Sequence, residues 1–431
     1  MVTMSTALLT DHYELTMVDA ARRSGRAERR SVFEVFTRRL PGDRRYGVVA
    51  GTGRLLDDID RFRFGDEELA FLEERGVVST ETLAWLADYR FHGSIRGYRE
   101  GELFFPHSPI LQVEGTFAEA VLLETLILSV LNHDCAVATA ASRMVQHAAG
   151  RPLIEMGSRR TSEHAAWAAA RAAYLVGFSH TSNLEAGRRF DIPTLGTAAH
   201  AFTLVHDSEK EAFQAQIDTL GESTTLLVDT FDVKSAVEQA IEVAGVDLGA
   251  VRIDSGDLPT VVKEVRAQLD RLGAHRTRIV VTNDLDEYAI AGLQASPVDA
   301  YGVGTSVVTG SGHPAAGLVY KLVAREDDAG QMVSVQKTST GKSNPGGQKS
   351  AVRERRGQVA EAEHVGPGDQ LPADARALLV DWIREGEAAP AASATLDDVR
   401  SHHESVIAEL PDDAMRLTAG EPALPTVVHG S

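Results

Sequence analysis

The sequence predicts an α/β fold that contains a parallel β-sheet, and three observations support this prediction. Four short apolar runs, typical of buried strands, follow one another between residues 224 and 306. A stretch with helical spacing follows each of the first three runs, so that one strand-plus-helix unit takes about 22 to 28 residues. Each run also ends in polar residues. Strands and helices that alternate in this way form parallel sheets, either open or closed into a barrel.

The N-terminal part of the chain, up to about residue 115, mixes strand-like runs with helices. The segment 8–25 has helical spacing and stops at Gly25, and the segment 31–41 alternates apolar and polar residues imperfectly, as a strand would. From about 120 to 176 the chain is largely helical, and the alanine-rich run EHAAWAAARAAYLVG predicts a helix that ends at Gly177.

The four apolar runs of the predicted sheet are TTLLVDTFD, AVRIDSGD, RIVVTNDLD and AYGVGTS. Because the carboxyl ends of parallel strands meet at one edge, where ligands bind in α/β folds, the residues that end these runs predict a site. These residues are Asp229, Asp254, Asp257, Asn283, Asp284, Gly302 and Gly304.

The composition changes after about residue 330. A polar, glycine-rich and basic segment at 338–357 predicts a loop or hairpin, and the segments 371–387 and 392–410 each predict an amphipathic helix. The TGKS sequence at 340–343 resembles the end of a phosphate-binding loop. We reject that motif because residue 336 is Gln where the motif requires Gly.

The composition excludes several classes of partner and site. The chain has 43 Lys and Arg against 62 Asp and Glu, a formal charge of −19, which argues against nucleic acid as a partner. The single cysteine, Cys135, allows neither an intrachain disulfide nor a cysteine-based zinc site, and suits a cytoplasmic protein. The N-terminus has no signal-peptide pattern. The apolar segment 117–131 contains two glutamates and predicts a buried helix rather than a membrane span.

Three short motifs each fit a structural or a functional interpretation. IDSGD at 253–257 fits a turn held by side-chain hydrogen bonds, or a site for a sugar diol or Mg²⁺. GSRRT at 157–161 fits a solvated surface, or an anion clamp at the start of a helix. His200 lies among small and apolar residues in GTAAHAF, a setting that suits a packed core histidine as well as a catalytic one.

Seven motifs in chain order resemble those of nicotinate phosphoribosyltransferases: TDHYELTM, FEVFTRRLP, GSRRT, TSNLEAG, GTAAHAF, RIDSGDL and YGVGT. The resemblance covers residues 8 to about 320 and continues in ELPDDAMRLTAGEPALPTV. It implies the type II phosphoribosyltransferase fold, an irregular (β/α) barrel with an α/β sandwich domain. We therefore expect residues 121–329 to form the barrel-like catalytic domain, and residues 1–120 with about 330–431 to form the sandwich domain.

The resemblance also implies an activity and an assembly. The family forms nicotinate mononucleotide and pyrophosphate from nicotinate and 5-phosphoribosyl 1-pyrophosphate (PRPP), coupled to ATP hydrolysis and assisted by Mg²⁺, in NAD salvage. It works in the cytoplasm as a homodimer whose active sites lie at the interface. The alternatives are a nicotinamide or quinolinate phosphoribosyltransferase and, in another class, a catalytically dead metabolite sensor on the same scaffold.

The resemblance assigns roles in catalysis and in ribose binding. His200 resembles the histidine that ATP phosphorylates. Asp254 and Asp284 resemble the residues that hold the ribose hydroxyls, and we expect Asp254, with His200, to be catalytic. Arg252, in RIDSGDL, is expected to bind substrate. Asp254 and Asp257 are the candidate Mg²⁺ ligands.

The resemblance also places residues around the pyridine ring. Arg159 resembles the arginine that holds the ring's carboxylate, and Tyr13 the aromatic residue that stacks on the ring from the partner subunit. Met156 stands where the family usually has an aromatic residue, so that only a sulfur–aromatic contact is available there. Ser182 stands where nicotinamide-specific relatives carry Asp, which would repel a carboxylate, so Ser182 favours nicotinate.

Phosphate contacts complete the expected site. Gly302, Gly304 and Thr305, in YGVGT, resemble the residues that hold the 5′-phosphate. Either Arg38 or Arg39 is expected to meet the pyrophosphate, and the sequence does not distinguish between them.

Overall fold

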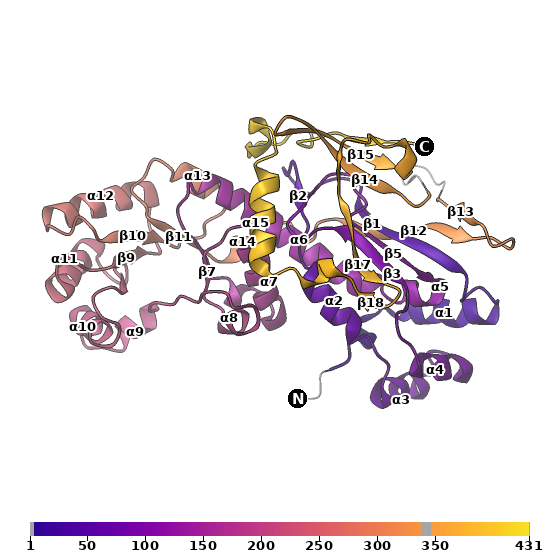
Figure 1. The fold of residues 1–431 in the computed structure, drawn as a ribbon. Coiled ribbons are helices and arrows are strands. Elements are labelled where there is room, and N and C mark those ends of the chain that lie inside the picture. The colour runs from indigo at the N-terminus through magenta and orange to yellow at the C-terminus, as the bar shows by residue number, and fades with distance from the viewer. Residues whose placement is uncertain (1–3, 338–345, 431) are drawn as a thin grey trace. The chain divides into compact units, whose positions relative to one another are not determined.

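The computed structural model describes residues 4–337 and 346–430, which form two compact units (Figure 1). Unit 1 joins Met1–Ala136 to Ala315–Ser431, and unit 2 is the continuous segment Val137–Pro314. The boundaries expected near residues 120 and 330 both fall inside unit 1. The difference arises because the first part of α6 (Glu124–His147) and the whole of β12 (Leu318–Glu326) belong to unit 1.

Unit 1 is built on an antiparallel sheet of seven strands in the order β13-β12-β1-β5-β3-β17-β18. Strand β1 pairs with β12 on one side and β5 on the other, and seven of its eight residues are buried. A strand covered on both faces needs no strict alternation, which explains the imperfect pattern of segment 31–41. The strands are β1 (Arg30–Thr37), β3 (Ser94–Tyr98), β5 (Leu111–Thr116), β12 (Leu318–Glu326), β13 (Met332–Ser334), β17 (Leu379–Arg384) and β18 (Glu387–Ala388).

Two smaller sheets of unit 1 have the orders β16-β14-β15-β19 and β2-β4. The segment 338–357 contributes strand β14 and the turn at Gly357 that leads into β15, whereas residues 338–345, with the TGKS sequence, lie outside the described residues. The strands are β2 (Gly47–Val48), β4 (Leu103–Phe104), β14 (Ser350–Arg356), β15 (Val359–Gly366), β16 (Arg376–Ala377) and β19 (Thr426–Val428).

The helix predicted over residues 371–387 is wrong. This segment forms β16, β17 and β18 instead. A short apolar run such as ALLVDWI fits a buried strand as well as a helix, and the antiparallel pairing of β17 with β3 determines the outcome.

Two helices of unit 1, α1 and α15, show how side-chain caps set their starts. A capping box of Asp11 and Glu14 starts α1, which ends before Gly25 at φ 71°, as predicted. The Thr395 side chain accepts from the Asp398 amide and starts α15 inside the predicted segment 392–410. The helices are α1 (His12–Arg23), α2 (Thr52–Asp60), α3 (Asp66–Glu74), α4 (Thr80–Ala87), α5 (Phe117–Val121), α15 (Leu396–Ile407), η1 (Ala7–Leu9), η3 (Gly368–Gln370), η4 (Pro390–Ser393) and η5 (Asp412–Met415).

The apolar segment 117–131 forms α5 and the first part of α6, and its residues pack into the hydrophobic core of unit 1. By length and composition alone, the helical stretch Phe117–His147 qualifies as a candidate membrane span. However, 67% of its most apolar window is buried inside the protein. Such burial is typical of a core helix, in agreement with the prediction.

Unit 2 contains a curled parallel sheet in the order β7-β6-β11-β10-β9-β8 (Figure 1). Strands β7 and β8 end this order, so the sheet is an open half-barrel, the irregular (β/α) barrel that we expected. The four predicted strands are confirmed as β8 to β11, whereas the short β6 and β7 escape prediction. The strands are β6 (Leu153–Glu155), β7 (His180–Thr181), β8 (Thr225–Leu227), β9 (Ala250–Ile253), β10 (Arg278–Val281) and β11 (Ala300–Val303).

Helices follow the strands of unit 2 along the chain. The alanine-rich helix α7 ends at Leu175, two residues before Gly177 at φ 124°. The helices are η2 (Ser158–Arg160), α7 (Glu163–Leu175), α8 (Leu184–Phe190), α9 (His200–Leu204), α10 (Glu209–Leu220), α11 (Val233–Ala244), α12 (Leu258–Arg271), α13 (Glu287–Gly292) and α14 (Thr305–Val308).

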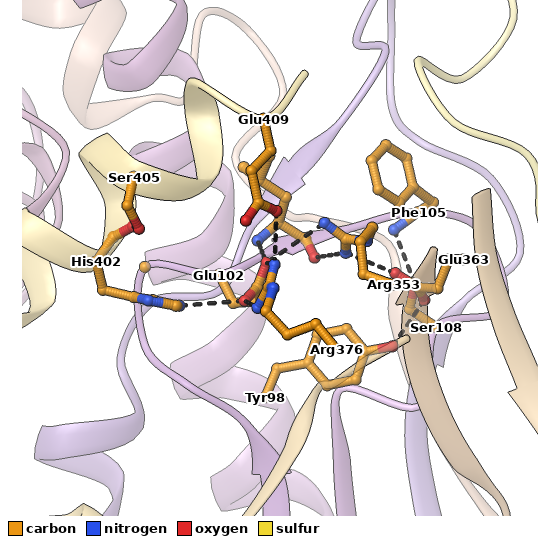
Figure 2. Close-up of polar contacts among 12 residues, drawn as sticks. Tyr98, Glu102, Phe105, Ser108, Arg353, Glu363, Arg376, His402, Ser405 and Glu409 are labelled. Carbon is orange, nitrogen blue, oxygen red and sulfur yellow. Dashed lines mark hydrogen bonds and ion pairs between the residues drawn. The ribbon is translucent and has the colours of Figure 1, made fainter. Parts of the chain in front are cut away.

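A buried cluster of charged residues joins early and late segments of unit 1 (Figure 2). The Arg353 side chain on β14 is fully buried, and its guanidinium donates to Glu363 at 2.7 Å and to Glu102 at 3.4 Å. The hydroxyls of Tyr98 and Ser108 also donate to Glu363. Each buried carboxylate therefore faces a guanidinium, which offsets the cost of removing these charges from water.

Glu102 is the second centre of this cluster. Arg376 donates to its carboxylate at 2.6 Å, and the His402 Nε2 atom on α15 lies 3.1 Å from it. Burial raises the pKa of Glu102. The His402 hydrogen bond and the charges of Arg353 and Arg376 outweigh burial and hold that pKa well below its usual range. The cluster thus fastens β14, β16 and α15 to the segment 98–108.

We predict that Arg353→Met lowers the free energy of unfolding by about 3–5 kcal/mol, because two buried carboxylates lose their compensating charge. Equilibrium urea unfolding followed by circular dichroism measures the change. Arg356→Met is the matched control on the same strand. Its side chain is 84% exposed and pairs with Glu361, so the expected loss is below about 1 kcal/mol. Equal losses for the two variants would contradict the prediction.

Candidate functional site

A pocket of about 470 Å³ lies in unit 2 at the carboxyl ends of the parallel strands. Its lining comes from the segments that directly follow β6, β7, β9, β10 and β11, together with the segment 195–199 that precedes α9. The lining residues are Met156, Ser158, Arg159, Arg160, Ser182, Leu195, Gly196, Thr197, Ala198, Ala199, Arg252, Asp254, Thr282, Asn283, Asp284, Gly302, Gly304 and Thr305.

The structure brings most of the predicted site residues together in this pocket. The predicted residues that line it are Met156, Arg159, Ser182, Arg252, Asp254, Asn283, Asp284, Gly302, Gly304 and Thr305. Arg160, Thr197 and Thr282 also line it but have no predicted role. Thr282 comes directly after the RIVV strand, and Arg160 belongs to GSRRT, so their positions carry the signal that could have identified them.

His200 begins α9 directly after the lining residue Ala199. Its side chain is 41% exposed, which contradicts the interpretation as a packed core histidine. The Nδ1 atom lies 3.2 Å from the Thr230 hydroxyl, and the Nε2 atom lies 3.8 Å from the Asp254 carboxylate. The imidazole is therefore held beside the pocket with its second nitrogen toward a lining carboxylate.

Other predicted residues lie elsewhere. Tyr13, on α1 of unit 1, is 46% exposed, and burial together with Glu124 raises its pKa to about 12, so the phenol stays protonated. Arg38 and Arg39 follow β1, also in unit 1. Asp257 precedes α12 and accepts a hydrogen bond from the Thr260 hydroxyl.

Hydrogen bonds hold Asp254 in place at the end of β9. Its carboxylate accepts from the Thr282 hydroxyl, and its backbone amide donates to Asp229 at 2.8 Å. Asp229 also accepts from the Ser255 hydroxyl at 2.6 Å. The residues after β9 form a bend at 255–256, and the Asp254 carboxylate lines the pocket.

The pocket combines three guanidinium groups with two carboxylates. Arg159 and Arg160 are exposed on η2, whereas Arg252 donates to the Thr197 hydroxyl at 2.7 Å. Burial lowers the pKa of Arg252, opposed by the nearby Asp254, and an arginine remains charged at neutral pH. Such a lining suits a ligand with several negative groups and with hydroxyls that donate to carboxylates.

The backbone is tightly constrained at two residues that line the pocket, Gly302 and Asp284. A Cβ atom at Gly302 would lie 2.6 Å from the Thr282 methyl carbon and 2.8 Å from the Met156 sulfur, so only glycine fits. Asp284 has φ 35°, a left-handed conformation that costs a non-glycine residue of order 1–3 kcal/mol. Strain of this kind is found mainly at ligand-binding and catalytic positions.

Among the residues that the structure describes, no group of three or more His, Cys, Asp or Glu side chains is arranged to hold a metal ion. Asp254 is a pocket carboxylate, whereas Asp257 is engaged at the start of α12. The binding of Mg²⁺ by these two candidate ligands stays a prediction.

Comparison with known families gives two matches that together cover most of the chain. Residues 8–132 match the nicotinate phosphoribosyltransferase (NAPRTase) N-terminal domain. Residues 152–359 match the nicotinate phosphoribosyltransferase (NAPRTase) family.

Individual relatives agree with these matches. A nicotinate phosphoribosyltransferase of Mycobacterium tuberculosis is 54% identical over 97% of this chain and 94% of its own length. A nicotinate phosphoribosyltransferase of Bacillus subtilis is 36% identical over 85% of this chain and 76% of its own. The crystal structure of human nicotinic acid phosphoribosyltransferase superposes with a TM-score of 0.82 at 25% identity, over 97% of both chains.

Proposed function

Because the chain belongs to the nicotinate phosphoribosyltransferase family and is an enzyme of that activity, we propose that the pocket of unit 2 is its active site. There, the ring nitrogen of nicotinate displaces pyrophosphate from C1 of PRPP and forms nicotinate mononucleotide. The observation that carries this proposal is the convergence of the arginines, carboxylates and glycines on one pocket of about 470 Å³. Both substrates are anions, and the pocket supplies their counter-charges within a protein of net charge −19.

The pocket residues divide between the two substrates. Arg159 binds the carboxylate of nicotinate, and the Met156 thioether covers one face of the ring. Ser182 places no negative charge near that carboxylate and so does not repel it. Asp254 and Asp284 accept hydrogen bonds from the ribose hydroxyls.

The phosphate end of PRPP faces residues 302–305, where the two glycines let the backbone approach the 5′-phosphate. Arg252 provides positive charge within the same pocket. Either Arg38 or Arg39, both in unit 1, remains our proposal for the pyrophosphate contact. The location of the enzyme in the cytoplasm also stays a prediction.

The reaction needs positioning and charge stabilisation more than a protein nucleophile. As the C1–pyrophosphate bond lengthens, positive charge develops on the ribose and negative charge on the leaving group. The Asp254 carboxylate can stabilise the positive charge on the ribose. The guanidinium groups can stabilise the negative charge on the pyrophosphate. Asp254 and Arg252 are oriented before the substrates arrive, because they form hydrogen bonds with Thr282 and Thr197, respectively.

Mg²⁺, when bound, neutralises the pyrophosphate leaving group. The residues present fit an ion carried mainly by substrate oxygens, with Asp254 as one protein ligand, because Mg²⁺ commonly takes one or two carboxylates plus phosphates. Asp257 is less suited to this role because it is not among the residues that line the pocket.

We also propose that the enzyme is a homodimer in which Tyr13 of each subunit covers the pyridine ring in the other subunit. Two observations support this arrangement. The pocket lining in unit 2 contains no aromatic residue, and that unit lies wholly within the described residues. Tyr13 is a half-exposed aromatic residue on α1. An interface site would bring the two together.

The test of the function is pyrophosphate release from PRPP with nicotinate, nicotinamide or quinolinate offered in turn, and nicotinate is the expected substrate. Ser182→Asp should weaken nicotinate binding by ~1–3 kcal/mol, because it places a carboxylate near a carboxylate. Ser182→Asn is the matched neutral control. An unchanged KM for nicotinate in Ser182→Asp would show that this residue does not face the ring substituent.

We propose that ATP phosphorylates His200 and thereby couples ATP hydrolysis to turnover. His200→Ala should abolish both the ATP stimulation and an acid-labile phosphoenzyme while the fold is retained. His206→Ala is the control, because His206 follows the same short helix and its ring bonds to the Phe202 carbonyl. Undiminished ATP stimulation in His200→Ala would refute the coupling role.

Subunit mixing tests the interface site. Tyr13→Ala and Asp254→Ala proteins, each expected to be severely impaired, should regain activity when mixed. About half of the dimers are then mixed, each with one intact site, so activity should approach roughly a quarter of wild type. If mixtures with exchange confirmed by mass spectrometry stay as inactive as their parents, Tyr13 acts in its own subunit.

A further inference from the structure

Glu155 is a buried carboxylate that the proposed mechanism does not use. It is the last residue of β6, is 0% exposed, and directly precedes the pocket segment 156–160. Within the part of the chain that the structure describes, no cationic side chain forms an ion pair with it. A buried carboxylate without a cation is costly unless its oxygens accept hydrogen bonds, so its bonding partners define its role.

The two oxygens of Glu155 bond to two different segments of the pocket. Oε1 accepts from the backbone amide of Gly157, and Oε2 accepts from the Thr181 hydroxyl. Gly157 is two residues before Arg159, and Thr181 is next to Ser182. The Glu155 side chain therefore connects two segments. One carries Arg159, which is expected to bind the carboxylate of nicotinate, and the other carries Ser182, which is expected to favour nicotinate over nicotinamide.

Further hydrogen bonds close a ring around Glu155. The amide of Asn183 donates to the Thr181 hydroxyl at 3.0 Å, and its side chain donates to the Ser158 hydroxyl at 2.9 Å. In addition, the Ser182 amide donates to the Glu155 carbonyl at 2.8 Å. Ring closure fixes the separation of the two segments, because neither can shift without breaking a bond on the other.

Packing limits movement of the first segment on its other side. A Cβ atom at Gly157 would lie 2.2 Å from Val308 and 2.9 Å from the Gly304 carbonyl. The Met156 amide donates to the Val303 carbonyl at 2.8 Å. The segment is thus seated between the 303–308 region and the Glu155 carboxylate, and Glu155 supplies the contact with the 181–183 segment.

We propose that Glu155 is a positioning residue for selection of the pyridine substrate, which holds Arg159 and Ser182 at the separation that fits a ring carboxylate. The proposal rests on the proposed function, because that function assigns these two residues to the ring. It concerns the pyridine half of the pocket. The ribose contacts at Asp254 and Asp284 follow different strands and do not bond to Glu155.

Steady-state kinetics of Glu155→Ala test the proposal. The KM for nicotinate should rise about tenfold or more, since displacements near 1 Å can cost a hundredfold. The KM for PRPP should change less than about threefold. The kcat/KM for nicotinate divided by the kcat/KM for nicotinamide should fall as the KM for nicotinate rises. Glu155→Gln keeps an acceptor for Gly157 and should lie between Glu155→Ala and wild type.

Two further variants separate positioning from general stability. Thr181→Val removes one arm of the ring and should shift the nicotinate KM in the same direction, non-additively with Glu155→Gln. It also keeps the test available if Glu155→Ala does not fold. Glu287→Gln alters another buried carboxylate of unit 2, bonded to Arg143 and Ser311 outside the pocket. It should lower the melting temperature without changing either KM.

The outcomes that would overturn the proposal are distinct. If the Glu155 and Thr181 variants raise both KM values together, or lower only the melting temperature, Glu155 has a structural role alone. If the wild-type enzyme releases no pyrophosphate with nicotinate, the proposed function fails, and this inference fails with it. A selective loss of nicotinate affinity in active variants supports both.

Discussion

Parallel pairing of the six strands in unit 2 is the constraint on which the candidate active site depends. Because every strand of this sheet runs in the same direction, the segments that follow the strands emerge at one edge. Residues as far apart in the chain as Met156 and Thr305 therefore line a single pocket. The tight fit of Gly302 against Thr282 and the left-handed conformation of Asp284 both occur at this edge. The tightly packed Gly302 and the left-handed Asp284 thus both line the pocket that we propose as the active site.

The pocket has more guanidinium groups than carboxylates, although the protein as a whole is negatively charged. An anionic substrate approaches a chain of net charge −19, so binding depends on a local excess of guanidinium groups. The three arginines of the pocket differ in their contacts. Arg252 is anchored to Thr197, whereas Arg159 and Arg160 extend from a short helical turn.

Patterns of composition predicted the parallel strands because a buried strand is a continuous apolar run, and they predicted most of the pocket because polar residues end those runs. Prediction failed where local sequence is compatible with two structures. The run around Trp382 became β17 through pairing with β3, and β6 is too short to stand out from the helical sequence around it. The exposure of His200 depends on how α9 packs, which no local pattern specifies. Glu155 escaped notice because its partners, Gly157 and Thr181, meet it only in the folded protein.

The discontinuity of unit 1 has a consequence for how the chain is made. During synthesis, β1 emerges early, but its partner β12 begins only at residue 318, after the whole of unit 2 has been translated. The carboxylate of Glu102 is likewise neutralised by an arginine 251 positions later. The nascent N-terminal segment must therefore wait on the ribosome with an unpaired strand edge, the kind of exposed surface that is prone to aggregation. The continuous unit 2 contains all of its own sheet and faces no such delay.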